Sequence, residues 1–156
     1  MFDLRVISLP FKMKVSIPIY IMKVEGGGNH LLIKSRFNSD VRGYLIIDTG
    51  ASVSAFDKET CRPFSELLAN QKEIQSSGVT SESLNAEPVK LKKLFLGRYS
   101  FELSQAVLID LTHIKQLYSQ FSAKNIIGLL GGNFLIQHRA IIDYRNNLLH
   151  LETSYE

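Results

Sequence analysis

The sequence has very little cysteine, and this limits the chemistry it can support. Its 156 residues include one cysteine, Cys61, which excludes an intramolecular disulfide and a zinc site built on cysteines. No nucleophile signature surrounds Cys61, so a structural or incidental thiol is the preferred interpretation. The four histidines are well separated, and none stands at ligand spacing from another histidine or an acid. We therefore expect no metal and no cofactor.

Excess charge and long apolar runs are also scarce. The 18 Lys and Arg residues against 15 Asp and Glu give a net charge of +3, and the basic residues are scattered. No basic stripe with interleaved aromatic residues is visible, so we expect no nucleic-acid partner. The apolar stretches 6–11 and 15–24 are too short for a secretion signal or a membrane span. The sequence thus predicts a cytoplasmic protein without membrane association.

Hydrophobic residues make up 45% of the chain and charged residues 21%, which is typical of a soluble globular protein. We expect one domain over residues 1–156. Runs of β-branched and aromatic residues between turn residues predict strands. These strands are 15–21, 30–37, 43–47, 105–111, 140–144 and 148–152, and residues 94–103 are expected to form a hairpin with its turn at Gly97 and Arg98. Many short strands at close spacing favour an all-β barrel or sandwich.

Three segments are predicted to depart from strand. Residues 57–69 are expected to be helical or irregular, and 128–136 to form a loop that leads into a short helix. Residues 112–121 have helical spacing. Their apolar face consists of Ile114, Leu117, Tyr118 and Phe121. The polar segment between 74 and 93 predicts a hairpin tip between two strands.

The strongest local feature is an acidic residue that directly follows three large apolar residues. Asp48 comes after the predicted strand 43–47 and is followed by Thr49, Gly50, Ala51 and Ser52. Burying a lone carboxylate at the end of a strand costs free energy unless hydrogen-bond donors or a shared proton compensate. An Asp-Thr-Gly tripeptide alone is a common turn signal, but the apolar residues before it and the Ala-Ser after it make it more specific.

At these residues the sequence resembles the retropepsin-like aspartic proteases, in particular their bacterial single-lobe members. A second motif of that family is two apolar residues and a glycine before a short helix. It matches Leu129, Leu130 and Gly131, with Asn133 where bacterial members carry Asp or Asn. The hairpin predicted from strands 140–144 and 148–152 is similar to the family's closing hairpin.

The resemblance implies a fold as well as a site. The expected fold is all-β, a closed barrel of the acid-protease type in a single lobe, with one or two short helices. Residues 1–14 would form an N-terminal arm, and a flap would lie at about 74–90. The candidates for the flap tip are Ser77, Gly78 and Val79.

The resemblance also assigns roles within the first motif. Asp48 would be catalytic, and Thr49 would hydrogen-bond across a dimer axis. Gly50 would let the substrate backbone approach and donate its amide to the carboxylate. Ala51 and Ser52 would complete the loop, with Ser52 supporting Asp48. Viral members carry an Asp at the position of Ser52 and an Arg at that of Gly132; here both members of that ion pair are missing together, so no charge is left unpaired.

Aspartic peptidase chemistry needs two carboxylates about 3 Å apart that share a proton. No second Asp-Thr/Ser-Gly is present in this chain, and a two-lobed monomer would need about twice its length. The resemblance therefore implies a homodimer in which each copy supplies one Asp48. The predicted function is an aspartic endopeptidase that acts on a peptide or protein substrate. The alternative is a catalytically inactive module of the protease fold that binds peptides or dimerises.

Overall fold

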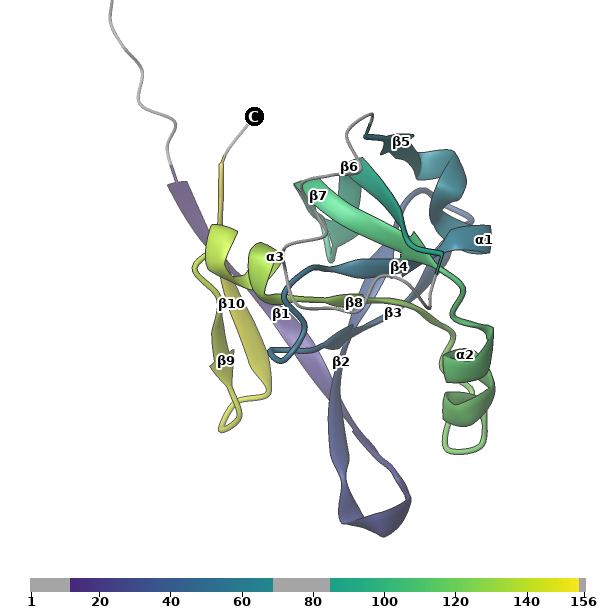
Figure 1. Cartoon of the computed structure of the whole chain (residues 1–156). Helices are drawn as coiled ribbons and strands as arrows, with labels where there is room; N and C mark the ends of the chain where they lie inside the picture. The colour runs from purple at the N-terminus through teal and green to yellow at the C-terminus, as the bar shows by residue number, and fades with distance from the viewer. Residues whose placement is uncertain (1–11, 69–84, 155–156) are drawn as a thin grey trace, which may run out of the picture.

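The structure is a computed structural model that describes residues 12–68 and 85–154 (Figure 1). Its first half contains β1 (Lys12–Lys23), η1 (Glu25–Gly27), β2 (Asn29–Arg36), β3 (Arg42–Ile47), β4 (Ala55–Asp57), α1 (Lys58–Cys61), η2 (Arg62–Phe64) and β5 (Ser65–Leu67). The second half contains β6 (Glu87–Leu96), β7 (Tyr99–Ile109), α2 (Thr112–Ser119), β8 (Ile126–Leu130), α3 (Gly132–Gln137), β9 (Ile141–Asp143) and β10 (Leu148–Ser154).

Six strands close into a barrel, which confirms the predicted fold class. They follow the order β6-β7-β4-β8-β3-β2, and pairing between β2 and β6 closes the ring, with Ser35 opposite Leu96. Closure leaves no open edge within these six strands. The turn between β6 and β7 contains Gly97 at φ 60, a backbone conformation that glycine adopts at little cost.

Two barrel strands, β2 and β8, have buried residues on both faces, which explains the apolar runs Leu31–Ile33 and Ile126–Leu130. In β2, Leu31 and Ile33 belong to the main core, whereas Leu32 belongs to a second cluster that includes Tyr118 of α2. Successive side chains of a strand point to opposite faces. One face of β2 therefore fills the barrel, and the other packs under α2.

β1 connects the barrel to a hairpin outside it. Its first part, from Lys12 to Pro18, pairs with β10, and its second part, from Ile19 to Lys23, pairs with β2. β10 in turn pairs with β9, which ends the sheet (Figure 1). The predicted closing hairpin is present, and β1 already begins at Lys12, within the segment 1–14 that was expected to be an arm.

Four sequence predictions need correction. Residues 128–130, predicted as the start of a loop, belong to the strand β8, because this segment is buried between its parallel neighbour β3 and its antiparallel neighbour β4. The segment 57–69 includes the strand β5, which pairs with β6. Within the described residues there are three α-helices rather than one or two. In α2, Leu117 is exposed although its spacing placed it on the buried face.

None of the helices in the described ranges is long and apolar enough to cross a membrane.

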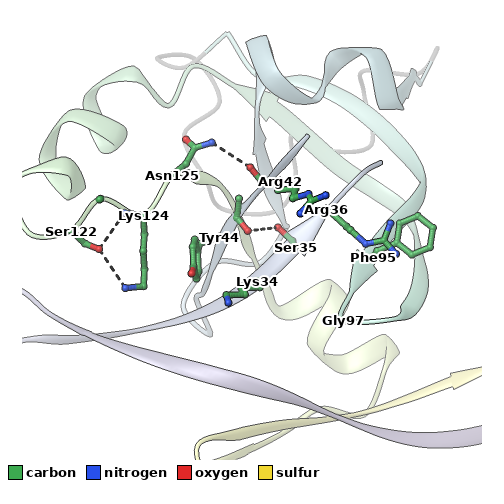
Figure 2. A pocket seen from close by; sticks show the side chains of 12 residues that line it. Lys34, Ser35, Arg36, Arg42, Tyr44, Phe95, Gly97, Ser122, Lys124 and Asn125 are labelled. Carbon is green, nitrogen blue, oxygen red and sulfur yellow. Dashed lines mark hydrogen bonds between the residues drawn. The ribbon is translucent and has the colours of Figure 1, made fainter. Parts of the chain in front are cut away.

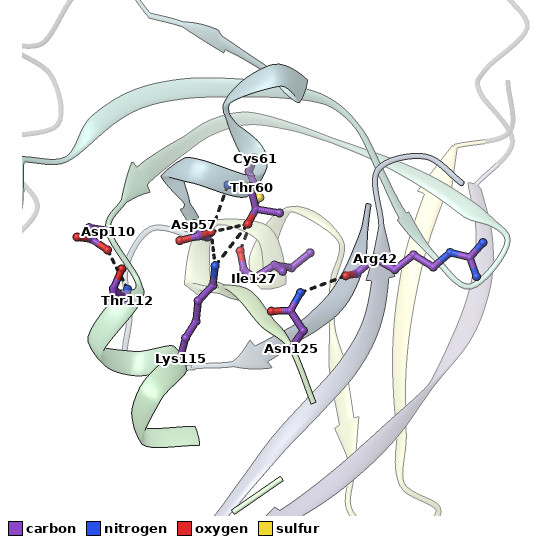
Figure 3. Close-up of polar contacts among 9 residues, drawn as sticks. All are labelled: Arg42, Asp57, Thr60, Cys61, Asp110, Thr112, Lys115, Asn125 and Ile127. Atoms are coloured by element: carbon purple, nitrogen blue, oxygen red, sulfur yellow. Dashed lines mark hydrogen bonds and ion pairs between the residues drawn. The ribbon is translucent and has the colours of Figure 1, made fainter. Parts of the chain in front are cut away.

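A buried ion pair anchors α2 to the barrel (Figure 3). The carboxylate of Asp57, at the end of β4, is 3% exposed and lies 2.5 Å from Lys115 Nζ of α2. Asp57 also caps α1 by accepting hydrogen bonds from the backbone and hydroxyl of Thr60. Burial raises the pKa of Asp57, but the hydrogen bonds from Lys115 and Thr60 outweigh it and hold the pKa below its usual value.

Candidate active site

Asp48 lies where β3 leaves the barrel, directly after the buried Ile47. Its side chain is half-buried, and its backbone amide donates to the carbonyl of Leu130 at 3.0 Å. Gly50 N donates to Asp48 Oδ1 at 3.0 Å, the hydrogen bond that the family resemblance implied. A Cβ on Gly50 would lie 3.3 Å from the same oxygen, closer than an ordinary contact. The turn therefore favours glycine at this position.

The two sequence motifs meet in space although about 80 residues separate them. β3 and β8 are parallel neighbours, with Ile47 opposite Leu130. Beyond these strands the first loop and the start of α3 are joined by the hydrogen bonds Gly132 N to Ala51 O, at 2.7 Å, and Asn133 N to Ser52 O, at 3.1 Å. The two motifs thus form one hydrogen-bonded unit that carries Asp48.

The backbone of Gly131 packs directly against the backbone of the Asp48 loop. A Cβ at Gly131 would lie 2.7 Å from the carbonyl carbon of Val53 and 2.8 Å from the carbonyl oxygen of Ala51. Backbone atoms cannot give way as the end of a flexible side chain can, so any larger residue would push the two motifs apart. The glycine of the second motif is therefore required by packing.

Beneath the loop, a hydroxyl and an amide connect the motifs. Ser54 is fully buried, and its Oγ donates to Asn133 Oδ1 at 2.9 Å and accepts from Gly131 N at 3.0 Å. Asn133 Oδ1 also accepts from Ser54 N, while Asn133 Nδ2 donates to the carbonyl of Gln105 at 2.7 Å. Each of these polar groups is paired, which suits a buried network.

Ser54 was not predicted to take part in the site, and the family resemblance implied Ser52 as the support of Asp48 instead. The Ser52 side chain is exposed. Within the described residues, Ser52 accepts a hydrogen bond from Asn133 N through its backbone carbonyl, not its hydroxyl. The signal for Ser54 was its position directly before the apolar strand β4, where it begins the buried segment 54–57. A hydroxyl placed there points inward and needs buried partners.

Asp48 and Thr49 border an open pocket of about 430 Å³. Its other lining residues come from β2, β3, α2, β8 and the β9–β10 hairpin, and they include His30, Tyr118, Ile142 and Tyr144. Within the described ranges, no Asp or Glu other than Asp48 lines this pocket. The pocket thus combines one carboxylate with apolar and aromatic walls, as small-molecule and peptide sites commonly do.

Tyr118 and His30 form a polar pair on the wall of this pocket. The Tyr118 hydroxyl and His30 Nδ1 are hydrogen-bonded, and their rings meet edge to face with centroids 5.4 Å apart. Burial, followed by the negative charge of Asp48, raises the pKa of Tyr118 above its ordinary value. The phenol therefore stays protonated near Asp48. No motif in the sequence connects α2 to this site.

Several other candidates lie elsewhere or outside the described residues. The flap-tip candidates Ser77, Gly78 and Val79 fall outside the described ranges, which include the paired strands β5 and β6 on either side. No group of three or more His, Cys, Asp or Glu residues that could hold a metal ion occurs in residues 12–68 and 85–154.

Cys61 is buried at the end of α1, and its Sγ lies 3.7 Å from the carbonyl oxygen of Ile127 (Figure 3). Burial, together with the charge of Asp57, raises its pKa to about 12. Because the thiolate is the nucleophilic form, Cys61 is inert at neutral pH.

Comparison with known proteins identifies the fold. No protein-family model matches the chain, and no curated protein matches it. Among solved structures, the retroviral protease-like domain of Ddi1 from Leishmania major is similar over 81% of this chain and 94% of that chain, with 14% identity and a TM-score of 0.50. A retropepsin-like aspartic protease from Rickettsia conorii is similar over 95% of this chain and 97% of that chain, with 20% identity and a TM-score of 0.48.

Proposed function

We propose that this chain, which has the retropepsin-like fold, is an aspartic endopeptidase that acts as a homodimer with one Asp48 from each copy. The observation that carries the proposal is the placement of Asp48. Backbone hydrogen bonds connect the loop of Asp48 to the second motif, and the carboxylate of Asp48 borders an open pocket with apolar walls. A carboxylate held in this way at the mouth of a pocket favours catalysis over a structural role.

The need for a second copy follows from the contents of the pocket. Water activation by an aspartate dyad requires two carboxylates that share a proton. Within the described ranges, the pocket beside Asp48 holds no other acid. The second carboxylate must then come from another molecule, and a two-fold axis near Asp48 supplies it with the same residue.

The β9 edge suits such an interface. Among the described strands, β9 pairs with β10 alone, so its outer edge is open. Ile141 on this strand is 63% exposed and Tyr144 just after it is 68% exposed, while Ile136 of the neighbouring α3 is 80% exposed. An open edge with large apolar side chains is a template for pairing with another chain.

This edge is also close to the catalytic candidate, because Ile142 and Tyr144 line the same pocket as Asp48. A copy that docks through β9 therefore approaches the pocket rather than the far side of the barrel. The proposed interface and the proposed dyad are thus compatible with one two-fold axis.

The proposed reaction needs no covalent intermediate. The ionised member of the dyad takes a proton from a water held between the two carboxylates, and the water oxygen attacks the scissile carbonyl. The protonated member donates to the oxygen that becomes the oxyanion, and the dyad then passes a proton to the leaving nitrogen. Gly50 N, which donates to Asp48 Oδ1, orients the carboxylate for this exchange.

The test is cleavage of a peptide library by the wild-type chain and by Asp48→Asn over acidic to neutral pH. We expect the wild type to cleave peptides and to be inhibited by statine-type transition-state mimics. The Asp48→Asn variant should cleave none, because an amide cannot act as the base. Asp40→Asn is the matched control, since Asp40 is an exposed acid in the turn between β2 and β3. Cleavage that survives in Asp48→Asn would refute the proposal.

A further inference from the structure

A second pocket, of about 620 Å³, lies on the barrel wall (Figure 2). It is formed by the ends of β2 and β3 where they approach their turn, by the β6–β7 turn, and by the segment 122–125 that precedes β8. The two pockets share no lining residue. This volume is within the range of about 300–1,000 Å³ that is usual for small-molecule sites.

The lining of this pocket is strongly basic. Lys34 and Arg36 come from β2, Arg42 from β3, and Lys124 from the segment before β8. Among its described lining residues there is no Asp or Glu. Figure 2 shows Lys34 and Lys124 on either side of Tyr44, with Arg36 and Arg42 near the same face. The fold thus collects four cations that are scattered along the sequence.

Several other basic residues of the described surface are paired with acids. Lys58 and Arg62 pair with Glu87, Lys90 with Glu102, Lys92 with Glu66, and Lys115 with Asp57. Within residues 12–68 and 85–154, none of the four pocket cations takes part in an ion pair. Their charge is therefore available to a ligand.

Two of the cations are opposed in a way that costs stability without a ligand. Arg36 and Arg42 are direct cross-strand partners of β2 and β3. Like charges in that position repel. Both side chains are nevertheless held: the Arg36 guanidinium lies 4.2 Å from the centroid of the Phe95 ring, and Arg42 Nε donates to the carbonyl of Ser39 at 2.6 Å. Among residues 12–68 and 85–154, the two terminal nitrogens of Arg42 have no hydrogen-bond partner, so they can donate to a ligand.

The opposite wall adds a hydroxyl. Ser122 Oγ accepts hydrogen bonds from Lys124 N at 3.2 Å and from Lys124 Nζ at 3.5 Å. A hydroxyl that accepts twice keeps its own hydrogen for donation. Lys124 Nζ has three hydrogens and also lies 5.6 Å from the centroid of Tyr44, so it retains donors for a ligand.

We propose that this pocket is a binding site for an anion that carries two or more phosphate groups. Guanidinium groups match phosphate oxygens with paired donors, and ammonium groups add point charge. A diphosphate would place negative charge between Arg36 and Arg42 and relieve their repulsion, while Lys34, Lys124 and Ser122 supply donors around it. A single carboxylate would leave most of these donors unused.

The experiment is calorimetric titration of the full chain with inorganic pyrophosphate at constant ionic strength, repeated with ADP. We expect saturable one-to-one binding per chain. Equal affinity for both ligands would show that the phosphates alone are recognised, and tighter binding of ADP would assign the site to a nucleotide. Either result supports the proposal, and the absence of saturable binding by both ligands would overturn it.

Two variants of the pocket remove different pairs of cations, so that one can be tested if the other fails to fold: Arg36→Gln/Lys124→Gln and Lys34→Gln/Arg42→Gln. Each should weaken pyrophosphate binding by about tenfold or more, because each removes two charge-assisted contacts. Lys14→Gln/Lys23→Gln is the control, since it removes two exposed cations outside the pocket. An equal loss in the control, or binding of a single-stranded oligonucleotide without binding of pyrophosphate, would overturn the proposal.

Discussion

Replacing Ser54 with alanine tests whether the buried network beneath the Asp48 loop holds the two motifs together. Ser54 Oγ is fully buried and takes part in two hydrogen bonds, as acceptor for Gly131 N and as donor to Asn133 Oδ1. The two losses are unequal. Asn133 Oδ1 still accepts from Ser54 N after the substitution, whereas Gly131 N is left without this acceptor in a buried position.

The expected magnitude follows from that difference. An unsatisfied buried N–H costs about 1–3 kcal/mol, and the loss of the second hydrogen bond costs about 1 kcal/mol more. Ser54→Ala should therefore lower the free energy of unfolding by about 3 kcal/mol. For a chain of this size, that corresponds to a decrease of about 6–12 °C in Tm. Because the network fixes the loop of Asp48, proposed peptidase activity should fall as well.

Urea denaturation followed by circular dichroism measures this change, with Ser52→Ala as the control. Ser52 has the same side chain two residues earlier, but it is exposed, so its substitution should change stability by less than about 0.5 kcal/mol. A Ser54→Ala chain as stable as the wild type, or an equal loss in Ser52→Ala, would refute the assignment of the supporting hydroxyl to Ser54.

Further predictions concern the ion pair, the buried histidine, the thiol and the open edge. Lys115→Met should lower the free energy of unfolding by about 3 kcal/mol, because it leaves the Asp57 carboxylate buried without its cation; denaturation at neutral pH measures this, and an unchanged midpoint would contradict it. Burial lowers the pKa of His138, so the native state binds its proton less readily than the unfolded chain, and its contribution to stability is lost as pH falls below about 6.5. His138→Leu should flatten the dependence of stability on pH below about 6.5, and an unaltered slope would contradict this. Cys61 should react with a thiol reagent at pH 8 only after denaturation, and rapid reaction of the native chain would contradict its burial. Ile141→Arg should shift the sedimentation mass from dimer toward monomer, and a wild-type chain that is monomeric at all concentrations would contradict the proposed interface.

The sequence predicted the barrel well because its strands have strong local signals. β2 and β3 contain runs of large apolar residues, Leu31–Ile33 and Tyr44–Ile47, and are bounded by turn residues, and the structure places them within a residue or two of their predicted limits. Residues 128–130 of β8 were predicted as the start of a loop. Gly128 is instead required by packing, since a Cβ there would lie 2.6 Å from the carbonyl oxygen of Ala55.

Features that depend on long-range contacts could not be predicted in the same way. Ser54 was overlooked because its partners, Gly131 and Asn133, are more than 70 residues away. Nothing in the spacing of Asp57 and Lys115 indicated a buried ion pair. The basic pocket was missed for a related reason: its cations are separated along the chain and become neighbours only when β2, β3 and the segment before β8 come together.

The central claim is that two chains each contribute one Asp48 to a single active site, and a mixing experiment tests it most directly. Wild-type and Asp48→Asn chains are combined in varying ratio at constant total concentration, allowed to exchange partners, and assayed for peptide cleavage. If both carboxylates are required, only wild-type pairs are active, and activity falls as the square of the wild-type fraction. An equal mixture should then retain about a quarter of the activity. A linear decrease, with about half of the activity in an equal mixture, would contradict the shared dyad.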